Sequence, residues 1–419
     1  MDSVLMPSEI ELFVETMQPH SMKNLGTEQW LEWHNRLQKL NQEALVEAAA
    51  VKEEHVQEVL VSYGKAKVLI HEAVLVHIWK YKVLPKLLKL EAEPQCTFIA
   101  YSVLYHEAVC VSLLELVMYH ASFCEALDDT AVDLLDYVSG VISQLLNAKP
   151  RDQPQHRENA EEELFRQRGN LSFEIGIRAL SMLRYLTENM DRLPISVCNR
   201  VYTTHDVPVL LVEVLHAKPW QHDDKQYHNG KWSQWDGERL AQAEAQVWLT
   251  LRHVLLDPEC PKYYPITENR RNQLVRLICL MGPHILDQLS PLAELKHWLC
   301  RLSCLEEYAA PAKPLLLEPV LEIKERILQE CGGKWRRIAE KQLQYIFSDD
   351  RDTLQEAAKK LTEAYNTDLI EKFENDDTHT CVNCGKVAIQ RCSKCKRSWY
   401  CSRACQVDNW QSHKEKCHH

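Results

Sequence analysis

The sequence predicts an all-α fold that ends in a small, cysteine-rich C-terminal module. Apolar residues recur at helical spacing through the first 370 of the 419 residues, and strand-like alternation is absent. Only 11 glycines are present, where average usage would give about 29. The clustered glycines of Rossmann and P-loop sites are missing, which excludes those nucleotide-binding enzymes. Seven of the 16 cysteines fall between position 381 and the C-terminus.

Three helices of the body can be placed by their start signals. Thr27 is a candidate N-cap for a helix over 27–40, and a polar run at 128–130 precedes a helix that continues to residue 145. Pro208 lies in the first turn of a third helix over 206–215, where proline is tolerated. Each segment has apolar residues three or four positions apart, so one face of each helix is predicted to be buried.

A nine-residue segment repeats in the body. Residues 68–76 and 103–111 agree at seven of nine positions and lie 35 residues apart. This period is typical of a two-helix unit in an armadillo- or HEAT-like stack, although an apolar helical chain can also repeat itself by coincidence. Both segments contain a His-Glu pair, but the second histidine that a zinc protease needs four residues later is absent.

Changes in composition predict the domain organisation. We expect a body over 1–350 with a candidate split near 147–169, a helix and acidic linker over 351–380, and the cysteine-rich module over 381–419. Residues 147–169, 219–237 and 309–319 are polar or proline-rich and are predicted to be loops. The 219–237 loop holds three tryptophans, which either pack onto the body or form a partner surface.

Cysteine usage and hydropathy predict a cytoplasmic protein. The first residues show no signal peptide, and no apolar run reaches the roughly 18 residues that a membrane span requires. Thiols stay reduced in that compartment, and the nine cysteines before residue 381 are predicted to be buried as small hydrophobic residues. His297, Cys300 and Cys304 share a helix face, and since no fourth ligand completes a metal site, they are predicted to be a core stripe.

The C-terminal module has the ligand spacing of a zinc finger. Cys-x2-Cys pairs and pairs four residues apart can each chelate one edge of a zinc tetrahedron. Eight ligands make two closed sites with no position for a reactive water, so the two Zn²⁺ ions are predicted to be structural and to supply the folding energy of the module. The predicted ligands are Cys381, Cys384, Cys392, Cys395, Cys401, Cys405, His413 and Cys417.

This spacing, the Trp399-Tyr400-Cys401 step and the Gln406-x3-Trp410-x2-His413 run resemble a MYND-type zinc finger. The resemblance implies interleaved sites, with Cys381, Cys384, Cys401 and Cys405 on one zinc and Cys392, Cys395, His413 and Cys417 on the other. It also implies a protein-interaction module in which Ser393, Gln406 and Trp410 contact a proline-rich peptide. Gln406 and Trp410 lie four residues apart and so share a helix face, although Trp410 could instead belong to the core of this small domain.

The charge distribution favours protein partners over nucleic acid. The module has eight basic and two acidic residues, whereas the rest of the chain has 41 basic and 58 acidic residues, a net charge of −17. A body of this charge repels nucleic acid, and residues 406–411 of the predicted helix carry no basic side chain. We therefore expect a non-enzymatic adaptor that binds proteins and neither nucleic acid nor membrane.

The body also resembles a family of MYND-finger proteins, in segments 173–185, 286–289 and 333–344. That resemblance implies a cytoplasmic adaptor or co-chaperone that preassembles the axonemal dynein arms of motile cilia. Its implied partners are a leucine-rich-repeat dynein assembly factor, chaperones and co-chaperones, with dynein chains as clients. Its implied locations are the cytoplasm, centriolar satellites, dynein assembly particles and the apical region of ciliated cells. The alternative is a MYND-type transcriptional corepressor adaptor; a MYND-bearing methyltransferase is excluded, because no Asn-His dipeptide occurs.

Overall fold

The computed structural model describes residues 4–50, 53–147, 159–304 (without 229, 236 and 238), 320–348, 381–384, 390–391 and 398–414. The chain divides into two compact units, residues 1–360 and 361–419, which are described separately below. The first unit is called the body and the second contains the finger. The predicted domain limits stay predictions, and the predicted helix and linker over 351–380 and loop over 309–319 lie outside the described residues.

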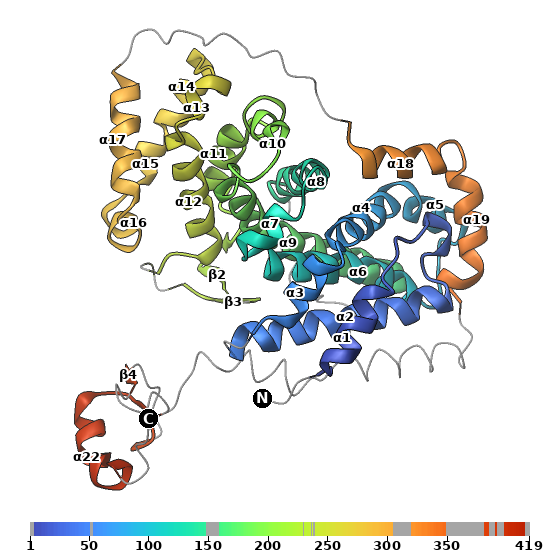
Figure 1. Cartoon of the computed structure of the whole chain (residues 1–419), viewed down its shortest axis with the longest axis horizontal. Helices are drawn as coiled ribbons and strands as arrows, with labels where there is room; N and C mark the ends of the chain where they lie inside the picture. Colours follow the sequence, from blue (N-terminus) through green and yellow to red (C-terminus); the bar gives the residue numbers. More distant parts are fainter. Residues whose placement is uncertain are drawn as a thin grey trace. The chain divides into compact units, whose positions relative to one another are not determined.

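The body is helical throughout its described part except for one small sheet (Figure 1). Its first helices are α1 (Pro7–Glu15), η1 (Met22–Asn24), α2 (Glu28–Ala50), α3 (His55–Ser62), α4 (Ala66–Lys82), α5 (Leu84–Leu90), α6 (Phe98–Met118), α7 (Ala121–Glu125), α8 (Thr130–Leu145) and α9 (Ala160–Glu188). The later helices are α10 (Ile195–Asn199), η2 (Arg200–Thr204), α11 (Val207–Ala217), α12 (Gln242–Leu256), α13 (Cys260–Tyr263), α14 (Glu268–Val275), α15 (Leu277–Leu280), α16 (Pro283–Gln288), α17 (Leu292–Ser303), α18 (Glu322–Cys331) and α19 (Trp335–Ile346).

Helices α4, α6 and α9 form the centre of the body. Helix α9 packs against α6, α8 and α12, and α6 packs against α2 and α4. Helices α4 and α6 have buried residues on nearly every side, among them Glu72, Lys80 and Glu107, as expected of helices surrounded by others. By length and composition α6 alone, in the part of the chain that the structure describes, could cross a membrane, but 78% of its apolar window is buried inside the body. Its environment is therefore that of a core helix.

The three predicted helix starts are confirmed. The backbone N–H of Trp30 donates to Thr27 Oγ1 over 3.4 Å at the start of α2. Helix α8 begins at Thr130, and α11 begins at Val207 with Pro208 in its first turn. The apolar residues that defined these helices are buried in all three.

Two predicted loops contain regular structure. Helix α9 begins at Ala160, inside the predicted 147–169 loop, because Asn159 and Glu162 form a capping box in which each side chain accepts the other's backbone N–H, over 2.8 and 3.1 Å. The predicted 219–237 loop instead contains an antiparallel sheet of β1 (Gln221–His222), β2 (Lys225–His228) and β3 (Lys231–Gln234). Gly230, between β2 and β3, has φ +80°, a conformation that glycine allows in a tight hairpin.

Two of the three tryptophans of this sheet region, Trp220 and Trp232, pack back onto the body. Trp220 is fully buried and donates its Nε1–H to Glu244 over 3.1 Å. The Trp232 ring stacks on Phe173 of α9, with ring centroids 5.5 Å apart. The Trp235 Nε1–H donates to the Arg239 carbonyl over 3.0 Å. Of the two alternatives for this segment, the structure therefore favours packing on the body.

Helices α18 and α19 pack against the N-terminal half of the body, although the partners lie far apart in the sequence (Figure 1). Gln342 of α19 accepts the Trp79 Nε1–H over 2.9 Å and donates to the Met22 carbonyl over 2.7 Å. Asp133 of α8 accepts the backbone N–H groups of residues 323 and 324, which caps the start of α18. Gly26 has φ +85°, and a Cβ there would lie 2.5 Å from the Ile346 side chain, so glycine permits this close approach.

The repeated segments lie in α4 and α6, which pack against each other. This placement does not establish an armadillo- or HEAT-like stack, which stays a prediction. Of the nine cysteines before residue 381, five are buried, Cys96 is half-buried and three are exposed. The predicted core stripe is wrong, because His297, Cys300 and Cys304 are all exposed on α17. Helical spacing placed them on one face but could not tell whether that face was inside, and Leu295, Leu299 and Leu302 form the buried face instead.

Candidate metal centre

In its described residues, the finger consists of one strand pair and one helix. Strand β4 (Gln390–Arg391) pairs antiparallel with β5 (Trp399–Tyr400), and α22 (Arg403–Lys414) follows directly. Tyr400 is fully buried and donates its hydroxyl to Asn409 of α22 over 3.2 Å, which joins the strand to the helix. The Val382 N–H donates to the Trp399 carbonyl over 3.0 Å, which holds the first cysteine turn against β5.

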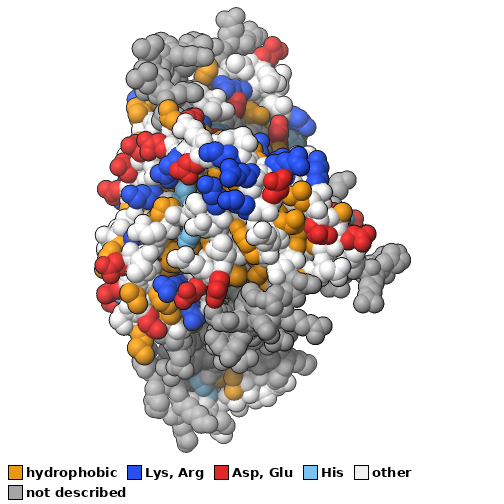
Figure 2. Space-filling view, turned by 90° about the vertical axis from the view of Figure 1, so that its right-hand side faces the viewer, with side chains coloured by type: hydrophobic (Ala, Val, Ile, Leu, Met, Phe, Trp, Pro, Cys, Tyr) orange, Lys and Arg blue, Asp and Glu red, His pale blue; other side chains and the backbone are white. Residues whose placement is uncertain are grey.

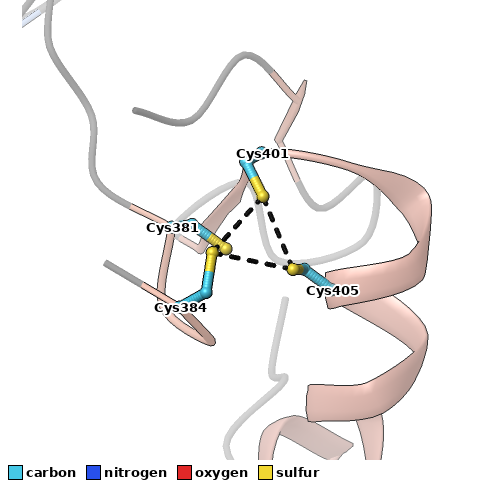
Figure 3. A group of neighbouring side chains, drawn as sticks. All are labelled: Cys381, Cys384, Cys401 and Cys405. Atoms are coloured by element: carbon cyan, nitrogen blue, oxygen red, sulfur yellow. Dashed lines mark hydrogen bonds between the residues drawn. The ribbon is translucent and has the colours of Figure 1, made fainter. Parts of the chain in front are cut away.

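Four cysteines converge where these elements meet (Figure 3). Cys381 and Cys384 lie on the first turn, Cys401 follows β5, and Cys405 lies in the first turn of α22. Their ligand sulfurs all lie within 4.8 Å of one another. The four-residue spacing of Cys401 and Cys405 predicts a shared helix face, but Cys401 precedes the helix, so the ligands come from the β5–α22 connection and from α22.

The sulfur spacing fits a zinc ion. The Cys384–Cys401 and Cys401–Cys405 Sγ distances are 3.4 Å, and the Cys405–Cys384 distance is 3.7 Å. A tetrahedron with Zn–S bonds of about 2.3 Å has edges of about 3.8 Å, so a modest expansion accommodates the metal. The Cys381 thiol supplies the fourth protein ligand. Four protein ligands close the coordination sphere of zinc, which is typical of structural sites.

The surroundings shift the pKa values of two of these thiols in opposite directions. Although burial opposes it, backbone N–H groups of Cys401, Cys384 and Asn383 lower the pKa of Cys381 to about 6. Hydrogen bonding to the Cys384 and Cys405 sulfurs raises the pKa of Cys401 to about 12. Without a cation, four sulfurs this close cannot all be thiolates, and a divalent metal removes that repulsion.

One member of the predicted second ligand set lies in the described part of the finger. His413, on the last turn of α22, is buried and its Nδ1 lies 3.2 Å from the Ser398 hydroxyl. Its ring also contacts Tyr400 and Trp410, with centroids 6.0 and 5.9 Å away. The other predicted ligands, Cys392, Cys395 and Cys417, lie outside the described residues.

The candidate peptide-binding residues lie partly on α22. Trp410 is 39% exposed, so its ring is available to a partner, and Gln406 is half-buried one turn earlier. Ser393 lies outside the described residues. Sequence reasoning missed Val407 and Val382, which are 65% and 58% exposed. The i, i+3 spacing of Val407 and Trp410 could have indicated an apolar addition to this surface.

The repeated His-Glu pairs of the body occupy the core rather than a metal site. Glu107 accepts Lys80 over 2.7 Å, His77 over 2.9 Å and the Tyr137 hydroxyl over 2.9 Å. Burial would raise the pKa of Glu107, but the Lys80 charge and the His77 contact lower it to about 2. Within the described residues, the only group with metal-site geometry is the four-cysteine cluster of the finger.

Glu72 is satisfied in the same way by His20 and His106, each with a ring nitrogen 3.3 Å from Oε2. Burial opposes ionisation, but these hydrogen bonds hold the pKa of Glu72 far below its usual range. Both carboxylates are therefore buried together with their hydrogen-bond partners. Their hydrogen bonds join side chains within the packed core around α4 and α6.

Comparison with known proteins agrees with this geometry. A MYND finger family model matches residues 381–417. The chain is 36% identical over 443 residues to the zinc finger MYND domain-containing protein 10 homolog of Drosophila melanogaster, which covers 98% of each chain. Shorter matches include ubiquitin carboxyl-terminal hydrolase 19 of Arabidopsis thaliana, 44% identical over 54 residues (13% of this chain, 8% of that protein), and protein CBFA2T2 of Xenopus laevis, 27% identical over 103 residues (24% and 17%).

No solved structure matches the chain. The relationship therefore rests on the finger, which combines a MYND match with a closed four-cysteine cluster, and on a similarity that extends along nearly the whole chain. On these grounds the chain belongs to the zinc finger MYND domain-containing protein 10 family.

Proposed function

We propose that this protein is a non-enzymatic adaptor or co-chaperone for the cytoplasmic preassembly of axonemal dynein arms, and that its finger recruits partner proteins. The observation that carries the proposal is an exposed Trp410 on a helix that begins at a closed metal cluster. A cluster with four protein ligands leaves no place for substrate or reactive water, whereas an exposed aromatic ring suits partner binding. The assignment to dynein arms comes from the family resemblance.

We propose that one set of finger residues binds zinc and that another set contacts the partner protein. We propose two structural zinc ions, on Cys381, Cys384, Cys401 and Cys405, and on Cys392, Cys395, His413 and Cys417. Zinc supplies a rigid cross-link between the first turn, β5 and α22, a segment too short to fold on a core alone. On the α22 surface so positioned, Trp410 and Gln406, with Ser393, contact the partner.

The proposed partners follow from the same family. They are a leucine-rich-repeat dynein assembly factor at the finger, chaperones and co-chaperones, and dynein chains as clients of the body. The proposed locations are the cytoplasm, centriolar satellites, dynein assembly particles and the apical region of ciliated cells. A net charge of −17 over the residues before 381 supports protein clients over nucleic acid.

Trp410→Ala tests the binding surface. We expect unchanged zinc content by elemental analysis, and a loss of partner affinity of about 2 kcal/mol, roughly 30-fold in Kd, because a central aromatic anchor is removed. Gln411→Ala changes a neighbouring exposed residue of α22 and serves as the matched control, with affinity near wild type.

Partners are identified by affinity purification from ciliating cells, with the wild-type chain compared with Cys381→Ala. Loss of dynein assembly factors from the Cys381→Ala sample supports the proposal. Equal recovery of all partners with both chains, or full affinity in Trp410→Ala, contradicts a binding role for the finger.

A further inference from the structure

Two neighbouring segments of the body carry a concentrated positive charge, which we call the basic face. Lys82 ends α4, and Lys86 and Lys89 of α5 follow four and seven positions later. Lys334 directly precedes α19, and Arg337 and Lys341 of α19 follow three and seven positions later. Helix α19 packs against α5, so the two rows belong to one region of the surface. Figure 2, which faces the side of the body where α18 and α19 lie, shows Lys and Arg side chains gathered there.

The two segments of the basic face contain few counter-charges. Residues 82–90 contain no acidic residue, and the one acid of 334–346, Glu340, pairs with Arg336 over 2.9 Å. In the described part of the chain, none of the six residues of the basic face forms an ion pair, and Lys334 donates only to a backbone carbonyl. Five of them are exposed and Lys86 is half-buried.

This arrangement is unfavourable in the isolated body. Arg337 and Lys341 are like charges four residues apart in α19, a spacing that destabilises a helix. The chain before residue 381 is acidic as a whole, with 58 acidic and 41 basic residues, so ion-pair partners are abundant elsewhere in the sequence. An anionic partner would relieve the repulsion on this face.

The helices that present the basic face are firmly held. Leu84 and Leu87 of α5 and Ile338 and Ile346 of α19 are buried on the opposite sides. Gln342 further ties α19 to Trp79 and to the Met22 carbonyl. The charges are therefore mounted on rigid helices, which lowers the entropy lost when a partner binds.

We propose that the basic face binds an acidic segment of a partner protein, a stretch rich in aspartate and glutamate. Nucleic acid fits less well, because Trp335 and Tyr345 are half-buried rather than open for base stacking, and the surrounding body repels a polyanion of high charge density. Leu90, 38% exposed at the end of α5, adds an apolar contact that a polypeptide can use. No residue of the finger belongs to the basic face, so this proposal does not depend on the proposed function.

The test is fluorescence anisotropy of a labelled oligoglutamate peptide against the full-length chain. We expect saturable binding at low salt that weakens about tenfold between 50 and 300 mM NaCl, since exposed charges are screened. The quadruple variant K86E/K89E/R337E/K341E should lose at least about tenfold in affinity. The control variant K67E/K225E/R276E/R301E makes the same change in net charge at exposed positions elsewhere and should retain wild-type affinity.

Circular dichroism establishes that both variants fold. If the quadruple variant misfolds, the pairs K86Q/K89Q and R337Q/K341Q replace it, each with an expected loss of about threefold. Equal losses in the test and control variants would show a general charge effect and overturn the proposal. Tighter binding of an oligouridylate RNA than of the peptide would overturn it in favour of nucleic acid.

Discussion

His34 lies at the centre of a buried hydrogen-bond chain. The Gln38 amide approaches its Nε2 within 3.2 Å, its Nδ1 lies 2.8 Å from His106 Nδ1, and His106 Nε2 lies 3.3 Å from Glu72. If Gln38 donates to His34, one order of donors satisfies all four ring nitrogens, with His34 donating to His106 and His106 to Glu72. Trp30 stacks on His34 with ring centroids 5.2 Å apart. A second proton on His34 would remove its acceptor and place a charge in the core.

Burial, followed by the nearby His106, therefore lowers the pKa of His34 well below its ordinary 6.5. The unfolded chain binds this proton near pH 6.5 and the folded chain does not, so stability falls as pH drops below that value. We expect the urea midpoint of the wild type to decrease from pH 7.5 to 5.5, and His34→Asn to reduce this dependence. Exposed His297→Asn is the control and keeps the wild-type slope. An unchanged slope in His34→Asn would refute the assignment.

At the scale of elements, α19 depends on one polar side chain. Gln342→Leu keeps a similar volume but leaves the Trp79 Nε1–H and the Met22 carbonyl without their partners in the core. We expect a loss of about 1–3 kcal/mol in the free energy of unfolding, the usual cost of an unsatisfied buried polar group. Gln344→Leu makes the same change at an exposed position of α19 and should alter stability by less than about 0.5 kcal/mol. Urea denaturation measures both, and equal effects would contradict the role of Gln342.

Helix starts that depend on nearby residues could be predicted from the sequence, whereas elements stabilised by residues distant in the sequence could not. Thr27 and Pro208 mark helix starts through contacts within a few residues, so the sequence reveals them. The sheet over 221–234 was missed because its stability comes from Trp232 and Tyr227 packing on Phe173, which is distant in the sequence. Docking of α19 on α5 is equally non-local.

The metal cluster was the easiest part of the candidate site to predict, since the spacing of its cysteines follows from zinc geometry. The four cysteines that the resemblance assigned to one zinc are brought together by the fold. The exposed position of His297 could not be predicted in the same way, because spacing identifies a shared face without its environment.

At the scale of the whole molecule, the two units should respond differently to loss of metal. The body has a large core of its own, whereas the buried apolar cluster of the described finger is formed by Cys381 and Tyr400. We expect a strong chelator to release two zinc ions per chain and to unfold the finger, since its binding energy is its folding energy.

The loss of helical ellipticity should then be small, because α22 contributes 12 residues and α9 of the body alone contributes 29. Colorimetric zinc titration and circular dichroism check both points, with thermal melting of the body as the control. Release of a single zinc would contradict the two-site proposal, and a lowered melting temperature of the body would show that the finger stabilises it.

The return of α18 and α19 to the N-terminal half also sets an order of events during synthesis. Trp79 and Gly26 leave the ribosome long before Gln342 and Ile346, which cover them in the finished body. During synthesis, the surface of the N-terminal half around Trp79 and Gly26 therefore stays exposed until about residue 346 has emerged. Chains with such exposed surface are prone to aggregate. A premature stop after α17 would make that state permanent, and the product would be removed by quality control although most of its core sequence is present.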